Sequence, residues 1–176
     1  MFAYYTYLIS SLPALRFFNK MPFSLEELFV KCADLIPESE IKILRHICDS
    51  DASVLDLGSG ETLKKWITFE VALRNELVRA RASRQKVDPL KFIRFPDFPD
   101  TQIRHIALAA YRSASILEGE KILDEARWNF LESLSSGHYF DFDSLLIYAL
   151  KLRILERWEK IQQADKQALF NQAVLN

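Results

Sequence analysis

Apolar side chains in two long stretches of the chain recur with helical spacing. Between residues 61 and 85 they return every three or four positions, which predicts a long helix packed on at least one neighbour. From Asp141 or Asp143 to about residue 163 they cover most of the helical circumference, so we expect a second long helix that is buried. A short tail helix is expected over residues 165–175.

Start and stop signals place shorter helices in the first third of the chain. Ser24 and Glu27 have the spacing of a capping box, which predicts a helix over about 24–35. Another helix is expected over 38–48, with its apolar residues on one face. Residues 4–12 are rich in aromatic and aliphatic groups, and their pattern fits either a short strand or a first helix.

Two more helices are predicted between the long ones. Asp100 is placed to cap a helix over about 100–117, and Gly119 is expected to break it. The next helix is predicted over 120–134, because Gly137 suits the left-handed conformation that follows many helix ends.

The composition favours an all-α fold. The 176 residues include 4 glycines and 6 prolines, fewer turn residues than a many-stranded β fold requires. Three of those prolines lie among aromatic residues at 86–100, which we interpret as an internal connector. A chain of this length usually forms one domain. We therefore predict one compact all-α domain over residues 1–176, a bundle of about seven helices with two long ones.

Charge and apolar content exclude several classes of protein. Lys and Arg total 23 and Asp and Glu 24, a net charge of −1 that argues against a general nucleic-acid binder. No apolar run approaches the roughly 20 residues of a transmembrane helix, and the N-terminus lacks the basic region of a signal peptide. Cys32 and Cys48 form no C-x-x-C pair and are expected to be buried thiols. We therefore expect a cytoplasmic protein.

The sequence contains no recognisable arrangement of catalytic residues. His46, His105 and His138 lie on different predicted elements, and no metal-ligand spacing or activated nucleophile occurs. Asp141 and Asp143 could bind a cation, but acidic residues at a helix start favour a capping role. The sequence predicts no catalytic residue, no cofactor and no metal site.

The glycine-containing stretch at 54–60 resembles the first motif of nucleotide-type methyltransferases. Thr62 stands where that motif would have a third glycine, and no alternation of strands and helices follows. We therefore interpret the stretch as a polar loop before the helix that opens near Glu61.

Seven basic residues are concentrated between residues 74 and 94. Arg74 and Arg81 share a helix face, whereas Arg79 points elsewhere. Two interpretations stay open: the arginines complement the helix C-terminus, or they form a cationic patch for an acidic protein partner. Glu70 and Arg74 are expected to pair along the helix. The seven are Arg74, Arg79, Arg81, Arg84, Lys86, Lys91 and Arg94.

Three stretches carry a family resemblance. One is the aromatic segment at 4–13 followed by the helix start at 23–27. The second runs through 70–81 and contains Arg74-Asn75, and the third runs from Arg127-Trp128 through 137–152 to 156–158. Together they resemble a bacterial family of domains of unknown function encoded in operons for V/A-type ATPases. More distantly they resemble the C (eukaryotic d) subunit of those rotary enzymes.

This resemblance implies a role in a larger assembly. The C subunit is a longer, all-helical body that joins the rotor shaft to the membrane ring. By analogy we expect a non-enzymatic subunit or accessory factor, a C-subunit-like central-stalk adapter whose partners are other ATPase subunits. It would lie in the cytoplasm, peripherally on the inner membrane. A transient assembly or regulatory factor is the alternative, and a small-molecule enzyme is the least favoured class.

Ten residues follow from the resemblance as candidates for interaction or framework roles. For the two tryptophans, core packing is the alternative. The candidates are Glu70, Arg74, Asn75, Arg81, Arg127, Trp128, Tyr148, Lys151, Arg157 and Trp158.

Overall fold

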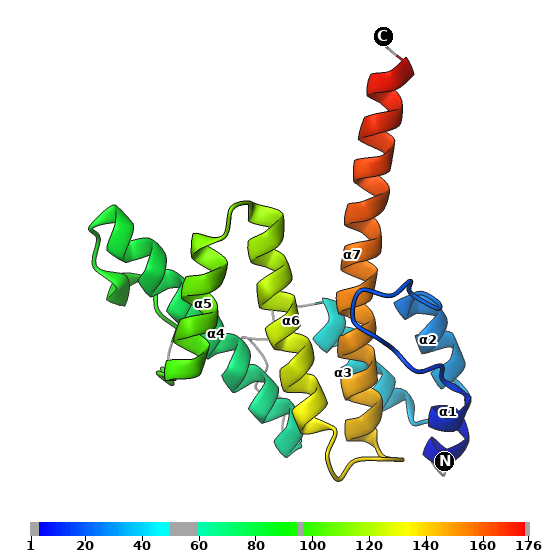
Figure 1. The fold of residues 1–176 in the computed structure, drawn as a ribbon. Coiled ribbons are helices and arrows are strands. Elements are labelled where there is room, and N and C mark those ends of the chain that lie inside the picture. Colours follow the sequence, from blue (N-terminus) through cyan, green and yellow to red (C-terminus); the bar gives the residue numbers. More distant parts are fainter. Residues whose placement is uncertain (1–3, 50–59, 95–96, 175–176) are drawn as a thin grey trace. The chain divides into compact units, whose positions relative to one another are not determined.

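The fold is known from a computed structural model that describes residues 4–49, 60–94 and 97–174. All regular structure in this part of the chain is helical, which confirms the all-α prediction (Figure 1). The elements are α1 (Tyr5–Ser11), α2 (Leu25–Cys32), α3 (Glu38–Asp49), α4 (Glu61–Gln85), the 3-10 turn η2 (Pro89–Lys91), α5 (Thr101–Arg112), α6 (Ile116–Leu134) and α7 (Phe142–Val174).

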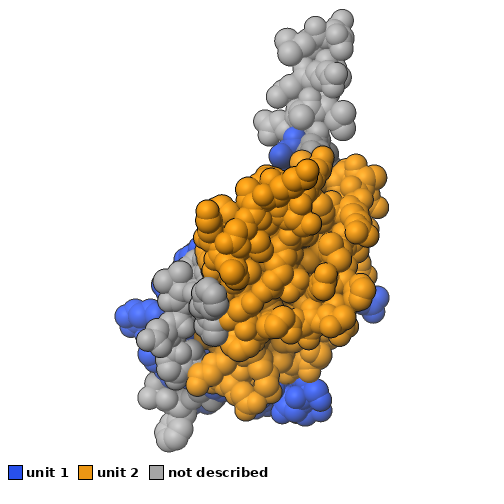
Figure 2. All heavy atoms as spheres, turned by 90° about the vertical axis from the view of Figure 1, so that its left-hand side faces the viewer, with its two compact units in different colours: residues 1–49, 135–176 blue, residues 50–134 orange. Residues whose placement is uncertain are grey.

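The chain divides into two compact units (Figure 2). Unit 1 comprises residues 1–49 and 135–176, and unit 2 comprises residues 50–134. Unit 1 therefore holds α1, α2, α3 and α7, and unit 2 holds α4, η2, α5 and α6. The assignment of all 176 residues to one domain stays a prediction.

In unit 1, α7 packs against both α2 and α3. Its aliphatic residues between Leu145 and Leu155, together with Trp158, are buried around the helix, as the sequence pattern predicted. Ser24 caps α2, because its Oγ accepts a hydrogen bond from the Glu27 N–H at 3.2 Å. The buried members of α7 are Leu145, Leu146, Ile147, Ala149, Leu150, Leu152, Ile154, Leu155 and Trp158.

In unit 2, α4 packs against α5 and α6, and these two helices form an antiparallel hairpin (Figure 1). Aromatic rings join α4 to α6. Phe69 and Phe130 stack with their ring centroids 4.2 Å apart, and the Trp66 ring lies 6.0 Å from that of Phe69. Asp100 caps α5 as predicted, since its Oδ1 accepts from the Ile103 N–H at 2.9 Å.

The break between α5 and α6 does not lie where the sequence analysis placed it. Gly119 is inside α6, and α5 ends at Arg112 rather than near Leu117. Ser115 caps α6, because its Oγ accepts from the Glu118 N–H at 3.1 Å. A Ser-x-x-Glu pattern is a start signal for a helix, and it outweighs the tendency of one glycine to interrupt a helix.

Gly119 is needed inside α6 for a packing reason. A Cβ built on Gly119 would lie 2.7 Å from the Ala110 carbonyl oxygen and 2.9 Å from Ser113 Oγ. The absence of a side chain therefore lets the start of α6 approach the end of α5 closely.

Other element bounds differ less. Residues 4–12, which the sequence left undecided, contain the helix α1, and α2 ends at Cys32 rather than near residue 35. The expected tail helix over 165–175 is wrong as a separate element, because α7 continues without a break to Val174. Gly137 has a φ of +90°, in the region predicted for the residue after a helix end.

The methyltransferase-like stretch lies almost entirely outside the described residues. Only its last member, Gly60, is described, and it is the N-cap of α4. The start of α4 at Glu61 agrees with the predicted helix opening.

None of the described helices combines the length and the apolar character that crossing a membrane requires.

Candidate interaction surface

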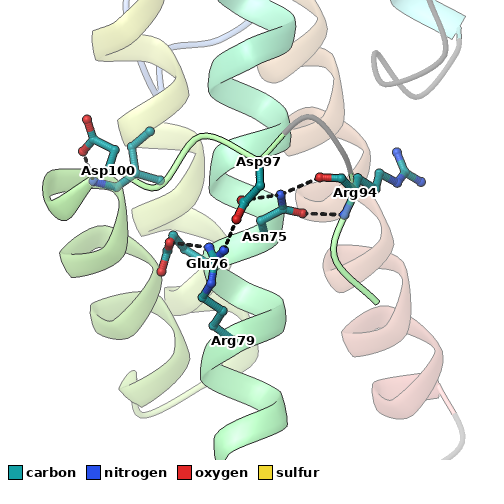
Figure 3. A network of polar contacts seen from close by, with 7 residues as sticks. Asn75, Glu76, Arg79, Arg94, Asp97 and Asp100 are labelled. Carbon is teal, nitrogen blue, oxygen red and sulfur yellow. Dashed lines mark hydrogen bonds and ion pairs between the residues drawn. The ribbon is translucent and has the colours of Figure 1, made fainter. Parts of the chain in front are cut away.

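Asn75 is fully buried on α4 and holds the connector against that helix. Its Nδ2 donates to the Arg94 carbonyl oxygen and to Asp97 Oδ1, both at 2.9 Å. Its Oδ1 accepts from the Arg94 N–H at 3.0 Å (Figure 3). A buried amide with three hydrogen bonds compensates the loss of its contacts with water. Asn75 is therefore a framework residue that fixes the course of the connector.

A charged cluster extends this network. Arg79 donates to Glu76 Oε1 at 2.6 Å and also binds the carboxylate of Asp97 (Figure 3). Glu76 is only 5% exposed, so its charge needs this partner. Two carboxylates thus balance the positive charge of Arg79 inside unit 2. Although Arg79 belongs to the basic segment, its charge is used in ion pairs within unit 2 and does not form part of a free cationic patch.

A second buried cluster joins α4 to α6. Arg127 Nε donates to Glu70 Oε1 at 2.7 Å, and Arg127 Nη1 donates to Asp124 Oδ1 at 2.8 Å. Asp124 is 2% exposed. Burial lowers the pKa of Arg127, but the Glu70 and Asp124 carboxylates more than offset this effect and leave the pKa raised. The guanidinium is therefore charged at any working pH. The predicted pair of Glu70 with Arg74 stays a prediction.

The two remaining candidates on α4 are exposed. Arg74 lies at the surface of α4. Arg81 lines a cavity of about 240 Å³ at the α5–α6 turn, together with Tyr111 and Glu120. Among the described residues Arg81 has no hydrogen-bond or ion-pair partner. The positive charge of Arg81, one of the predicted candidates, is therefore available to bind a partner.

Another cavity of unit 2, about 520 Å³, lies between α4 and α5. Arg104 and Arg112 on α5 line it, and Glu76, Arg79 and Ser83 line it from α4. Sequence reasoning missed both α5 arginines, because they lie outside the basic segment. Their spacing of eight residues, with Leu108 midway, was the available signal: successive steps of four turn about 40° each, so all three positions fall within one broad side of a helix.

In unit 1, Tyr148 fastens α7 to the segment that precedes α2. Its hydroxyl donates to the Pro13 carbonyl oxygen at 3.0 Å, and its ring stacks on Phe23 with 6.3 Å between centroids. Burial raises the pKa of Tyr148 to about 12. The phenol is therefore a neutral donor at physiological pH.

The other candidates on α7 differ in exposure. Trp158 is 5% exposed, and its ring centroid lies 4.8 Å from that of Phe18. Lys151 is half-buried, and Arg157 is exposed, with its guanidinium carbon 6.0 Å from the Trp158 ring centroid. Trp128 on α6 is equally buried, at 5%. Both tryptophans pack in the core of their units.

Asp141 has the capping role that the sequence analysis favoured. Its Oδ1 accepts from the Ser144 N–H at 2.8 Å, and its Oδ2 lies 2.7 Å from His138 Nδ1. Although partial burial acts in the opposite direction, the contacts with His138 and Ser144 lower the pKa of Asp141. Within residues 4–49, 60–94 and 97–174, no group of three or more His, Cys, Asp or Glu side chains is arranged to hold a metal ion.

Comparison with known sequences identifies one domain. A DUF2764 domain, whose description is "Protein of unknown function (DUF2764)", is found at residues 101–175. It spans α5, α6 and α7 and includes six of the ten candidate residues, from Arg127 to Trp158. Glu70, Arg74, Asn75 and Arg81 lie outside it.

Neither a curated protein nor a solved structure matches the chain significantly. The domain match names neither a function nor a partner. The resemblance to a family from ATPase operons therefore stays a prediction.

Proposed function

We propose that this protein is a non-enzymatic subunit or accessory factor of a bacterial V/A-type ATPase, acting as an adapter of the C-subunit kind in the central stalk. Its partners would be other subunits of that ATPase, and it would associate with the cytoplasmic face of the membrane through them. The sequence resemblance described above is the source of this assignment.

The observation that carries the proposal is that buried polar side chains of unit 2 bind one another and join its helices. The Glu70–Arg127–Asp124 cluster joins α4 to α6, and Asn75 fixes the connector. Buried, fully bonded polar groups of this kind hold helices in one arrangement. A part that transmits position between proteins needs a stiff body, and these clusters provide stiffness while cations such as Arg81 remain at the surface.

The test is purification of the ATPase from native membranes of a cell that makes the tagged protein at its normal level. Stoichiometric recovery with the intact complex would support a subunit. Recovery only with partly assembled complexes would favour a transient assembly factor. Recovery of the tagged protein with neither the intact nor a partly assembled ATPase would overturn the proposal.

A further inference from the structure

The cavity between α4 and α5 has a positive wall that the fold does not neutralise. Arg104 and Arg112 are exposed on α5, and among the described residues neither has a hydrogen-bond or ion-pair partner. Arg79, the third arginine of the cavity, is already balanced by Glu76 and Asp97. Asp100 at the cavity's edge is occupied in capping α5. The two α5 arginines are therefore the cations available to a ligand.

The spacing of these arginines limits what the ligand can be. Arg104, Leu108 and Arg112 lie four residues apart along one face of α5 and all line the cavity. The rise of a helix places the two arginines about 12 Å apart along its axis. A second helix lying alongside α5 would match them with two carboxylates two turns apart, separated by an apolar residue opposite Leu108.

We propose that the α4–α5 groove is a docking site for an acidic helical segment of a partner protein, whose carboxylates pair with Arg104 and Arg112. The proposal deepens the proposed function, on which it rests for the identity of the partner. Arginine suits this task because its planar guanidinium binds a carboxylate through two parallel hydrogen bonds. Helix recognition in a groove between helices, with an apolar anchor, is a common mode of protein association.

The first experiment uses the purified full-length protein and a synthetic probe. The probe is a fluorescein-labelled, alanine-rich helical peptide with two glutamates at the spacing of Arg104 and Arg112 and a leucine midway. We expect saturable binding in fluorescence anisotropy. The double variant Arg104→Glu, Arg112→Glu should weaken it about a hundredfold, because it places like charges opposite each other. The double lysine variant should bind with intermediate affinity, because it keeps the charges and loses the bidentate geometry.

The matched control is Lys64→Glu combined with Lys91→Glu. These lysines are exposed, belong to the same unit and do not line the cavity, so the net charge changes equally. The control variant should bind the peptide with an affinity within about twofold of wild type, because screened long-range electrostatics has only a small effect. All variants should keep the wild-type melting temperature. If both double charge reversals weaken binding equally, the site is not this groove and the proposal is overturned.

Two further results would also overturn it. If a peptide with glutamines in place of the glutamates binds equally well, the groove recognises apolar helices without regard to charge. If inorganic pyrophosphate displaces the probe more effectively than unlabelled peptide does, the site is for small anions.

The second experiment separates this inference from the proposed function. The Arg104→Glu, Arg112→Glu variant, tagged in the native cell, should no longer recover the ATPase on purification. The Lys64→Glu, Lys91→Glu control should still recover it. Full recovery of the ATPase with the Arg104→Glu, Arg112→Glu variant would overturn the groove as the docking site and leave the proposed function standing. If wild type binds the peptide but recovers no ATPase, the proposed function falls and the groove's acidic specificity stands.

Discussion

Glu70 on α4 and Arg127 on α6 are 57 positions apart in the sequence and form an ion pair with 2.7 Å between Oε1 and Nε. Both side chains are about four-fifths buried, and Asp124 shares the same guanidinium. The sequence analysis named both residues as candidates but predicted Arg74, not Arg127, as the partner of Glu70. The structure shows that they serve one cluster, which joins two helices of unit 2.

Replacing Arg127 by Met should destabilise the protein strongly. The change removes the guanidinium that binds the carboxylates of Glu70 and Asp124, and removal of one partner from a buried ion cluster costs about 3–5 kcal/mol. Glu70→Gln should cost less, about 1–2 kcal/mol, because Asp124 still balances the arginine. Urea unfolding followed by circular dichroism measures both. Lys64→Met, at an exposed site on α4, should change stability by less than about 0.5 kcal/mol. Equal effects of the Arg127 and Lys64 changes would contradict the assigned role of the cluster.

Asn75→Ala should release the connector. The substitution leaves the Arg94 backbone groups and Asp97 Oδ1 without the amide that binds them, at a cost of about 1–3 kcal/mol. We expect faster trypsin cleavage after Lys91 and Arg94 in the folded protein, monitored by mass spectrometry. Asn129→Ala, at an exposed asparagine of α6, is the matched control and should cleave at the wild-type rate. Unchanged cleavage in the Asn75 variant would show that the amide does not hold the connector.

Gly119→Ala should destabilise unit 2 although alanine is the better helix former. The gain in helix propensity is about 1 kcal/mol, whereas contacts of 2.7 Å and 2.9 Å with Ala110 O and Ser113 Oγ force a shift that typically costs about 1–3 kcal/mol. The melting temperature should therefore fall. Adding Ser113→Ala relieves one of the two contacts and should recover part of the loss. A rise in melting temperature for Gly119→Ala alone would mean that α5 and α6 do not approach as described.

Tyr148 should ionise at higher pH in the folded protein than in the unfolded chain. Burial raises its pKa to about 12, so its stabilising contribution is present below the unfolded value of about 10 and is lost as pH rises through about 12. A titration of tyrosinate absorbance should show a late component that Tyr148→Phe reduces. The remainder belongs to Tyr5, whose pKa is raised by burial and by its hydrogen bond to Glu40. The same variant should lose about 1 kcal/mol with the hydrogen bond to Pro13. Tyr139→Phe, at a residue that is 73% exposed, should leave both the late component and the stability unchanged.

The thiols of Cys32 and Cys48 should be inert until the protein unfolds. Both are free and buried, and burial raises their pKa values to about 11 and about 12, respectively. A thiol reagent such as DTNB at about pH 8 should react slowly with the native protein and rapidly in denaturant. Single Cys→Ser variants assign each phase. Rapid reaction of either thiol in the native state would contradict the observed burial.

Local signals in the sequence determined most of the helices. The caps at Ser24 and Asp100 and the start of α4 at Glu61 were predicted correctly, because a cap satisfies backbone groups within a few residues of itself. The apolar circumference of α7 likewise predicted its burial. The predicted break at Gly119 is wrong because a second local signal, the capping pattern of Ser115 and Glu118, starts α6 before the glycine.

Only the tertiary structure decided how the polar residues are used. Arg79 and Arg81 belong to the same basic segment, yet Arg79 is paired with Glu76 and Asp97 whereas Arg81 lies at the surface. Arg104 and Arg112 line a groove only because α4 packs beside α5 and forms its other wall. Helix formation depends on neighbours a few positions away, so sequence pattern suffices for it. Charge pairing depends on which helices meet, and that follows from the packing of the whole unit.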